Sequence, residues 1–376
     1  MNRKLWTLTA LLMVAAILLS ACGTKTVEKT VEVTRLVPAE GEKVVETVVV
    51  EVTREVPAAA APTGTRLQTI LDRGKLICGV NGGLPGFSFL DEATGQFTGF
   101  DADYCRAVAA ALFDDPNAVE FRPLSAKERS TALQSGEIDV LIRNTTWTSS
   151  RDASWGNFGP TIFYDGQGMM VRKDLGVTKL EDLAGASICV QTGTTTELNL
   201  TDKMRELGVD FTPVVFEDID STYAAYEEGR CDAVTSDRSQ LAARRTTMKN
   251  PDDHVILDVV MSKEPLGPVV PHGDDQWFDV VKWVVFATIQ AEEFGITSQN
   301  IDQFMNSDKP EIRRFLGLEG DLGQQLGLSN DFTVRIIRHV GNYAEIFDRN
   351  LTPLGLGRGV NTLWTEGGLL YSPPFR

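Results

Sequence analysis

Three polar groups in this sequence have the chemistry needed to hold a small zwitterion. Thr194 and Thr195 follow Gly193 where an apolar run gives way to a helical pattern, and a helix N-terminus there would offer hydroxyls and unpaired N–H groups to an anion. Arg151 can grip a carboxylate through two parallel hydrogen bonds, and Asp237 can neutralise an α-ammonium. Each group also has an ordinary structural role as the alternative. The threonines could cap a helix, Arg151 could form a surface ion pair, and Asp237 could lie in a solvated loop. Together they match the two charged groups of a free amino acid.

The elements that must position these residues follow an α/β pattern. Short apolar runs alternate with amphipathic stretches, which is typical of strands joined by crossover helices. Polar residues come directly after three predicted strands, at residues 138–142, 186–190 and 232–235. Because ligands of open α/β sheets bind beyond the carboxyl ends of the strands, we expect one cleft between two α/β lobes.

The composition limits the classes of partner. The chain has 376 residues with a formal net charge of −16, and no basic run offers a surface for nucleic acid or anionic lipid headgroups. Its three histidines are scattered and it has no Cys-x-x-Cys pair, so nothing has the spacing of metal ligands. We therefore expect neither a metal nor another cofactor.

The N-terminus has the organisation of a lipoprotein signal peptide over residues 1–21. Arg3 and Lys4 precede an apolar stretch shorter than the roughly 20 residues of a spanning helix, and the sequence Leu-Ser-Ala-Cys then ends at Cys22. This ending resembles bacterial lipoboxes, which implies that Cys22 begins the mature chain and carries a lipid. An uncleaved transmembrane anchor is the alternative. We expect an extracytoplasmic protein, in the periplasm or on the cell surface, that a lipid anchors to the cell membrane.

Residues 22–63 are predicted to be a flexible tether. Two similar stretches, residues 30–38 and 49–57, alternate valine with charged residues and precede an alanine-rich run. Such alternation can form a short strand, but with no second apolar layer to bury it we expect a solvated coil. A coil of about 40 residues reaches roughly 35 Å, enough to hold a globular body clear of lipid headgroups.

The cysteines fit an oxidising compartment once Cys22 is set apart as the lipid site. The four that remain are an even number and allow three pairings. We favour Cys78 with Cys105 and Cys189 with Cys231, because each pair then falls within one predicted lobe. Four buried free thiols are the alternative.

Several motifs after the tether resemble those of a known family. They are the segments at residues 83–88, 99–111, 144–152, 190–197, 229–238, 262–268 and 371–376. Together they are similar to the extracytoplasmic solute-binding proteins of polar amino-acid ABC importers. The resemblance is strongest to the branch that binds L-amino acids in general, or glutamate, glutamine, aspartate and asparagine.

The resemblance implies a two-lobed clamp with a central cleft, the type II periplasmic-binding-protein fold. The expected divisions are a first lobe over residues 64–168, a second lobe over 169–265, and a return to the first lobe with a C-terminal extension over 266–376. Crossings between the lobes are expected near residues 163–171 and 261–271. The implied protein is a monomer that closes around a free L-amino acid and passes it to a membrane permease.

The resemblance also implies roles for individual residues. The ligand's α-carboxylate would meet Arg151, the backbone of Thr195 and a nearby hydroxyl. Its α-ammonium would meet Asp237, the Thr146 hydroxyl and the Asn144 carbonyl. These assignments agree with the charges considered first.

The family's usual aromatic lid has no counterpart at the aligned position, which is Leu84. Phe87 is the alternative cover for a ligand, although phenylalanine near a strand end is more often part of a core. Asn81 and Arg129 are expected to contact the ligand's side chain, with a surface position as the open alternative for Arg129.

Two other functions remain open on this scaffold. One is a sensor subunit that passes the ligand state to a membrane kinase. The other is an enzyme such as a cyclohexadienyl dehydratase, which would need a carboxylate and a lysine facing the ligand. Because the predicted strand ends offer hydroxyls and an amide around one acid, we expect a binding protein without catalytic activity.

Overall fold

The computed structural model describes residues 25–37, 44–56 and 65–376. The predicted signal peptide and Cys22 lie outside these residues. The chain divides into two compact units between Thr63 and Gly64, each with its own β-structure. In the described part of the chain, no helix is long and apolar enough to cross a membrane.

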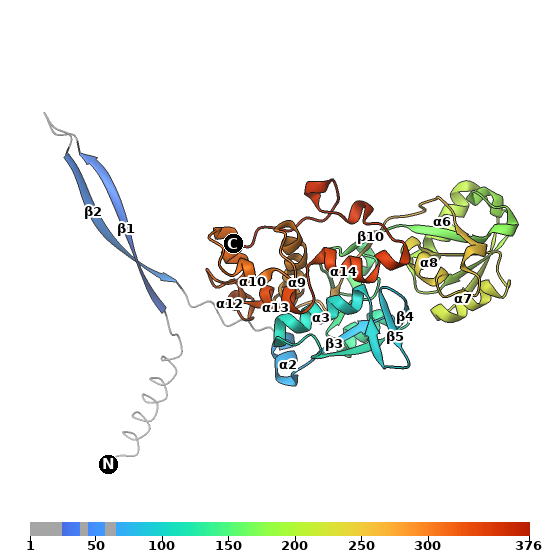
Figure 1. The fold of residues 1–376 in the computed structure, drawn as a ribbon, viewed down its shortest axis with the longest axis horizontal. Helices are drawn as coiled ribbons and strands as arrows, with labels where there is room; N and C mark the ends of the chain where they lie inside the picture. The colour runs from blue at the N-terminus through green and yellow to red at the C-terminus, as the bar shows by residue number, and fades with distance from the viewer. Residues whose placement is uncertain (1–24, 38–43, 57–64) are drawn as a thin grey trace, which may run out of the picture. The chain divides into compact units, whose positions relative to one another are not determined.

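The first unit contains an antiparallel pair of strands (Figure 1). β1 (Lys25–Val37) pairs with β2 (Val44–Val56), with the first residue of each strand opposite the last of the other. The coil predicted here is therefore wrong for these two stretches. β-branched valine and threonine favour extended backbone, and each strand supplies the hydrogen-bonding edge that the other needs. The role of residues 22–63 as a tether stays a prediction.

The first lobe of the second unit is built on a five-stranded sheet with the order β7-β3-β8-β17-β9. Its strands are β3 (Leu76–Val80), β7 (Val119–Pro123), β8 (Val140–Leu141), β9 (Asn157–Phe158) and β17 (Val269–Val270). β3 is parallel to β7 and β8, whereas β17 is antiparallel to β8 and β9. A smaller sheet contains β4 (Gly83–Leu84), β5 (Ser88–Asp91) and β6 (Gln96–Thr98).

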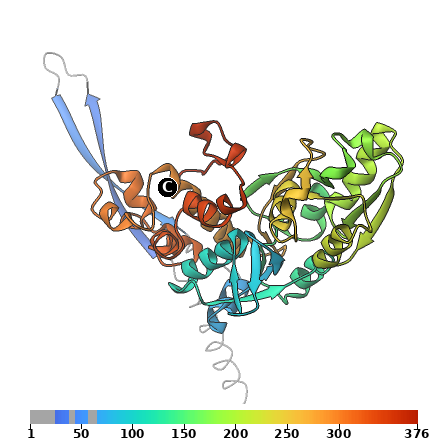
Figure 2. The same cartoon turned by 45° about the vertical axis from the view of Figure 1, so that its right-hand side comes forward.

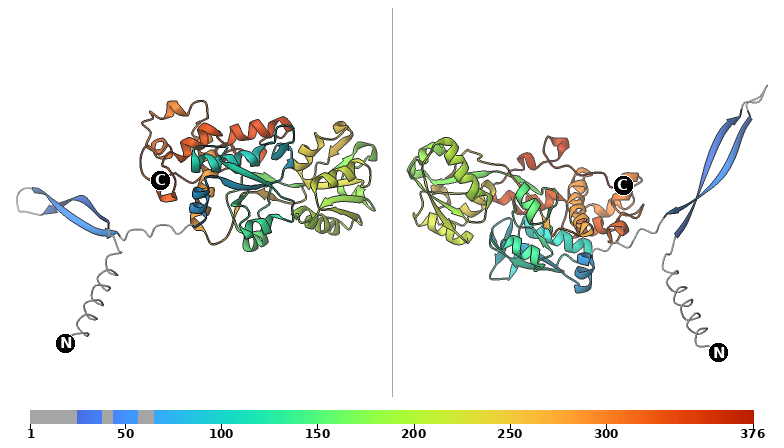
Figure 3. Two further views of the ribbon diagram at one scale, coloured as in Figure 1. Left: turned by 90° about the horizontal axis from the view of Figure 1, so that it is seen from below. Right: turned by 180° about the vertical axis from the view of Figure 1, so that it is seen from behind.

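Helices cover this sheet and complete the core of the first lobe. The two longest are α3 (Phe100–Phe113) and α9 (Asp275–Glu293), and α13 (Phe332–His339) contacts both. The others are α2 (Thr65–Arg73), α4 (Arg129–Ser135), α5 (Ser149–Ser154), α10 (Ile301–Phe304), α11 (Pro310–Phe315), α12 (Leu322–Leu326) and α14 (Tyr343–Asn350). Both views of Figure 3 show the orange and red C-terminal helices alongside the first lobe.

The second lobe has its own five-stranded sheet, with the order β13-β12-β14-β11-β15. Its strands are β11 (Gln167–Arg172), β12 (Ser187–Gln191), β13 (Thr212–Phe216), β14 (Ala233–Asp237) and β15 (His254–Ile256). Its helices are α6 (Thr195–Leu207), α7 (Ile219–Glu227) and α8 (Arg238–Arg245). β12 is parallel to β13 and β14, so their carboxyl ends lie at the same edge.

Two short strands connect the lobes. β10 (Phe163–Asp165) and β16 (Glu264–Leu266) pair antiparallel, with Asp165 opposite Glu264. Figure 2 shows the green and yellow second lobe set apart from the cyan and orange elements of the first lobe. The two-lobed α/β fold predicted from the sequence is confirmed. The exact divisions between the segments stay predictions.

Two pairs of cysteines lie at disulfide distance. The sulfur of Cys78 in β3 lies 2.15 Å from that of Cys105 in α3, within the first lobe. The sulfur of Cys189 in β12 lies 1.97 Å from that of Cys231, within the second lobe. These are the pairings favoured from the sequence.

Candidate functional site

The N-terminus of α6 lies just beyond the carboxyl end of β12. Thr194 is the N-cap, and its hydroxyl accepts a hydrogen bond of 3.1 Å from the Glu197 N–H. Gly193 makes the preceding turn with a φ of 74°, a value that glycine adopts without strain. The N–H groups of Thr195 and Thr196 belong to the first turn, which has no acceptors of its own for them. The hydroxyls of Thr194 and Thr195 donate to the Gln191 carbonyl and to Glu264, so this helix start offers its N–H groups to an anion.

Arg151 is held in a buried position on the first lobe by α5. Its residue is 7% exposed, its Nη1 donates to the Thr146 carbonyl at 3.1 Å, and its guanidinium lies 4.7 Å from the centre of the Trp155 ring. Burial lowers the pKa of Arg151, while Glu264 and Asp237 oppose that change. No carboxylate of the described residues comes within ion-pair distance of it. Arg151 is thus not a surface ion pair, and its other N–H groups are available to a ligand.

Asp237 ends β14 in the second lobe and is 5% exposed. Its carboxylate accepts no hydrogen bond from the described residues, and it begins α8 without capping it. Burial raises the pKa of Asp237 well above its ordinary value, and the carboxylates of Asp165 and Glu264 raise it further. Arg151 and Arg129 lower this pKa but do not offset the increase. A buried carboxylate without donors is unfavourable, so a cation placed against Asp237 would stabilise it.

Glu264, on the connecting strand β16, binds side chains of both lobes. Its carboxylate accepts hydrogen bonds from the hydroxyls of Thr146 at 2.5 Å and Thr195 at 2.8 Å, and from the Asn199 amide at 2.8 Å. The Ser262 hydroxyl is a further donor. Because the Thr146 hydroxyl donates its proton to Glu264, its lone pairs remain to accept from an ammonium.

Asn144 follows β8 in a backbone conformation that is uncommon for a residue with a side chain, with a φ of 30°. Its N–H donates to the Asp101 carboxylate at 2.8 Å, and its amide donates to Gln240 of the second lobe at 3.1 Å. Burial raises the pKa of Asp101 to about 7, with the Asn144 N–H and Arg143 opposing. These contacts fix the Asn144 backbone beside Thr146.

These residues surround a small cavity between the lobes, which we call the inner cavity. It is lined by Arg129, Arg143, Asn144, Thr146, Arg151, Gln191, Thr194, Thr195, Thr196, Ser236, Asp237 and Gln240. Its volume is about 20 Å³, which is room for about one water molecule. The structure therefore brings together seven of the predicted site residues, and an amino acid could enter only if the lobes move apart.

Arg129 belongs to the inner cavity and not to the surface, since it is only 3% exposed. Its guanidinium donates to the Gly193 carbonyl of the second lobe at 3.0 Å and to the Ala126 carbonyl at 2.9 Å. Burial lowers its pKa, and the neighbouring Arg143 and Arg151 lower it further. Arg129 thus joins the first lobe to the turn before α6.

Leu84 and Phe87 line neither this cavity nor its neighbour. Both are fully buried, and the Phe87 ring packs edge-on against Phe100 and Phe163 in the core of the first lobe. The Phe87 N–H donates to the Leu84 carbonyl at 3.2 Å, which closes a turn that directs the phenylalanine inward. Neither Leu84 nor Phe87 therefore covers a ligand in these cavities, and the contacts predicted for them are not supported.

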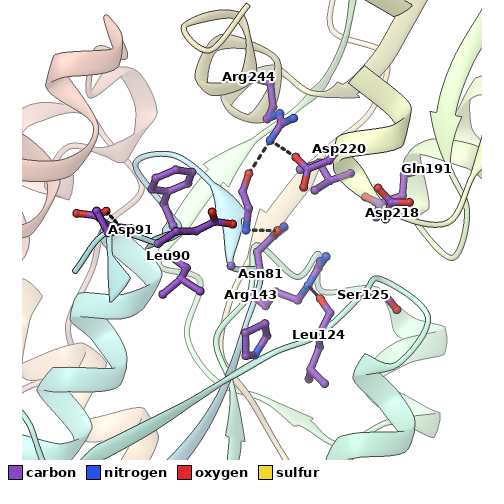
Figure 4. Close-up of a pocket in the computed structure, with 17 residues that line it drawn as sticks. Asn81, Leu90, Asp91, Leu124, Ser125, Arg143, Gln191, Asp218, Asp220 and Arg244 are labelled. Carbon is purple, nitrogen blue, oxygen red and sulfur yellow. Dashed lines mark hydrogen bonds and ion pairs between the residues drawn. The ribbon is translucent and has the colours of Figure 1, made fainter. Parts of the chain in front are cut away.

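A second, larger cavity adjoins the first, and we call it the outer cavity (Figure 4). It has a volume of about 630 Å³ and is lined by Asn81, Gly82, Gly83, Phe89, Leu90, Asp91, Glu92, Ala93, Pro123, Leu124, Ser125, Arg143, Gln191, Asp218, Ile219, Asp220 and Arg244. Arg244 of α8 bridges the lobes here, because it donates to the Gly83 carbonyl and pairs with Asp220, both at 2.8 Å. Asn81 lies here, with its amide 3.3 Å from the Asn144 side-chain oxygen.

Sequence reasoning missed several residues of the site. They are Arg143, Gln191, Gln240 and Glu264. Arg143 and Gln191 directly follow predicted strands, so a search of every polar residue at the strand ends would have found them. Glu264 had a different signal, a charged residue inside a predicted crossing between the lobes.

Comparison with known proteins agrees with this geometry. Residues 76–300 match the bacterial extracellular solute-binding proteins, family 3. The chain is 54% identical over 324 residues to the general L-amino acid-binding periplasmic protein AapJ of Rhizobium johnstonii, covering 85% of this chain and 95% of the relative. It is 50% identical over 323 residues to the glutamate/glutamine/aspartate/asparagine-binding protein BztA of Rhodobacter capsulatus, with the same coverage of 85% and 95%.

The fold of this chain also matches that of a solved periplasmic binding protein. An ABC transporter periplasmic binding protein from Brucella ovis with glutathione bound superposes with a TM-score of 0.80 and is 52% identical, covering 82% of this chain and 99% of that one. The names of these proteins describe solute binding, not catalysis, and the resemblance seen in the sequence motifs is confirmed. The chain belongs to the bacterial extracellular solute-binding proteins, family 3, and is an amino-acid solute-binding protein of the ABC-transporter type.

Proposed function

We propose that this chain captures free L-amino acids in the inner cavity and delivers them to the permease of an ABC importer. It would do so from outside the cytoplasm, anchored to the cell membrane by a lipid on Cys22. One observation carries the proposal: the buried Asp237 carboxylate, which lacks a hydrogen-bond donor among the described residues, lines the same small cavity as Arg151 and the N-terminus of α6. A cation-binding group and an anion-binding group in one small cavity suit the α-ammonium and α-carboxylate of one molecule.

The ligand's α-carboxylate would bind the free N–H groups of Arg151 and the N–H groups that begin α6. Its α-ammonium would bind Asp237, the lone pairs of the Thr146 hydroxyl and the Asn144 carbonyl. All of these contacts are between charged or partly charged groups in a site shielded from water. Each contact therefore contributes more binding free energy than it would at the surface. The two ends of the ligand would then be recognised by different lobes.

Ligand binding would hold the lobes together. Arg151 and Thr146 belong to the first lobe, whereas Thr195 and Asp237 belong to the second. A ligand that contacts all four residues is bound fully only when the lobes close around it, with the inner cavity wider than in this structure, so it shifts the population toward that closed state. The closed state would be the form that the permease recognises.

The outer cavity favours a second class of ligand, peptides with a free glutamyl α-amino and α-carboxyl end. Glutathione is such a peptide, and it is bound in the Brucella ovis neighbour. Its glutamyl end would occupy the inner cavity, and the rest would extend into the outer cavity of about 630 Å³. In calorimetry, the wild-type chain should bind glutathione and the Arg151→Ala variant should not. If the wild-type chain does not bind glutathione at millimolar concentration, this second class of ligand is contradicted.

The sensor and the enzyme remain the alternatives. A dehydratase needs a lysine near the ligand, and no lysine lines the inner cavity among the described residues. Turnover of prephenate or arogenate in a spectrophotometric assay would establish the enzyme. Uptake of labelled amino acid that requires both this chain and a permease would distinguish the importer from the sensor.

Calorimetry with two site variants tests the binding proposal. Arg151→Ala and Asp237→Ala should each weaken binding of L-glutamine by about 30-fold or more, because each leaves a charge of the ligand unpaired in a buried site. Arg205→Ala and Asp202→Ala remove exposed charges from α6 and serve as controls. Circular dichroism would establish that the variants are folded. Unchanged affinity in folded Arg151→Ala and Asp237→Ala would show that the site lies elsewhere.

A further inference from the structure

We propose that Arg143 selects the ligand by its side chain, binding a carboxylate or amide oxygen there, so that the chain prefers amino acids of the glutamate and glutamine type. This inference rests on the proposed binding of amino acids in the inner cavity. Arg143 was not among the residues that the sequence motifs indicated, but its position, its partners and its charge point to this role.

Arg143 is a buried arginine whose guanidinium is only partly used by the protein. The residue follows β8 and is 3% exposed. Its Nε donates to the Leu124 carbonyl at 2.8 Å, and Figure 4 shows the side chain reaching that carbonyl at the wall of the outer cavity. Its two terminal nitrogens have no hydrogen bond or ion pair among the described residues. Unpaired N–H groups in a buried arginine are unfavourable, so they favour a ligand with acceptor oxygens.

The position of Arg143 is where a ligand's side chain would pass. Only Arg143 and Gln191 line both the inner and the outer cavity, among the described residues. The inner cavity is lined by the groups that would hold the α-carboxylate and α-ammonium, and the adjoining outer cavity is about 630 Å³ in volume. A side chain that extends from the α-carbon would therefore pass between Arg143 and Gln191. The Gln191 amide already donates to the Glu217 carbonyl at 3.0 Å, and its oxygen can still accept a hydrogen bond.

The charges near Arg143 favour an anionic or neutral polar side chain over a cationic one. Three arginines and one aspartate line the inner cavity, because Arg129 and Arg151 lie there with Arg143 and Asp237. Burial lowers the pKa of Arg143 to about 10, while Asp101, Glu128 and Asp237 oppose the change, so the guanidinium stays protonated at neutral pH. A side chain with acceptor oxygens would give Arg143 the partners that it lacks.

The acidic residues of the outer cavity do not reverse this preference. Asp91, Glu92, Asp218 and Asp220 lie there; the last three are exposed, and the half-buried Asp91 already accepts hydrogen bonds from the Ala93 N–H and the Thr94 hydroxyl. Solvent and salt screen the attraction of exposed carboxylates for a cation, whereas Arg143 is shielded from both. A lysine or arginine ligand would also have to carry its charge past the guanidinium of Arg143.

Calorimetry with three ligands and two variants tests this inference. The ligands are L-glutamate, L-glutamine and L-norleucine, which has a side chain of similar length without oxygens. The wild-type chain should bind L-glutamate and L-glutamine about tenfold or more tightly than L-norleucine, since a charged hydrogen bond has about this value. Arg143→Met should weaken the binding of both polar ligands by about tenfold or more and change the affinity for L-norleucine far less. Arg143→Lys keeps the charge and should give an intermediate ratio.

The controls separate this inference from the proposed function. Arg122→Met removes an exposed arginine from the first lobe and should leave the ratio of affinities unchanged. If Arg143→Met does not fold, the ratio measured for Arg143→Lys decides the question. Equal loss for all three ligands, or an unchanged ratio in the folded variants, would overturn the role of Arg143. If the wild-type chain binds none of the three ligands, it is the proposed function that fails.

Discussion

The hydroxyl oxygen of Thr146 in the first lobe lies 3.3 Å from that of Thr195 in the second lobe. Both hydroxyls donate to one carboxylate, that of Glu264, on a strand that connects the lobes. The residues proposed for opposite ends of the ligand thus contact each other directly. This contact makes the movement of the lobes part of ligand binding.

Arg244 gives a test of closure away from the charged ends of the ligand. Its hydrogen bond to the Gly83 carbonyl joins the lobes at the outer cavity. Arg244→Ala should therefore weaken the binding of L-glutamine by about two- to twelvefold, which is the contribution of one hydrogen bond, and the loss should come from faster dissociation. Arg245→Ala on the same helix is the matched control. Stopped-flow dissociation rates that are equal in the two variants would contradict a role for this bridge in closure.

Binding should release protons because of Asp237. Burial, and then Asp165 and Glu264, raise the pKa of Asp237, and a bound ammonium would lower it again. The affinity should then be greatest above the raised pKa of the free chain and fall as the pH falls through it. L-glutamine is the suitable ligand, because none of its groups titrates between about pH 5 and 7. Calorimetry in buffers of different ionisation enthalpy would show the release; proton uptake, or no exchange at any pH, would contradict the assignment of Asp237.

Glu264→Gln should move this pH dependence. The charge of Glu264 raises the pKa of Asp237, so the neutral amide should let Asp237 ionise at a lower pH. The midpoint at which L-glutamine binding weakens on acidification should therefore shift to lower pH than in the wild-type chain. The measurement is the dissociation constant against pH for both proteins. A midpoint that is unchanged, or that moves to higher pH, would mean that the two carboxylates are not coupled.

Asp101 should make the folded chain less stable as the pH rises. Burial raises its pKa to about 7, and a carboxyl group with a raised pKa contributes stability below its unfolded pKa that is lost as the pH rises through the folded value. Asp101→Asn keeps an acceptor for the Asn144 N–H but does not titrate. The wild-type chain should lose up to about 4 kcal/mol more stability than this variant between about pH 4 and 8. Urea unfolding at both pH values checks this, with exposed Asp202→Asn as the control; parallel pH profiles would count against it.

The parts of the site that follow strands could be predicted from the sequence. Thr195 follows β12, Asp237 ends β14, and Arg151 lies on the helix after β8, so the rule that ligands bind at carboxyl ends located all three. Local pattern also predicted the lobes and the cysteine pairs. These features depend on residues close together in the chain or on a repeated α/β pattern.

The parts that depend on long-range pairing could not be predicted in the same way. Glu264 reaches Thr146 and Thr195 because β16 pairs with β10, about 100 residues away in the chain, and because Leu266 forms a bridge with Thr146. The inward direction of Phe87 depends on a turn and on aromatic partners from other elements. The pairing of β1 with β2 likewise depends on two stretches meeting, which neither stretch indicates alone.

The most direct test of the account is whether both α groups of one ligand are required. Calorimetry would compare L-glutamate with 4-aminobutyrate, which lacks the α-carboxylate, and with glutarate, which lacks the α-amino group. We predict a dissociation constant of about 1 μM or less for L-glutamate, near −8 kcal/mol, and binding weaker by about 30-fold or more for both analogues. If either analogue binds as tightly as L-glutamate, Arg151, the α6 N-terminus and Asp237 do not recognise the two ends of an amino acid.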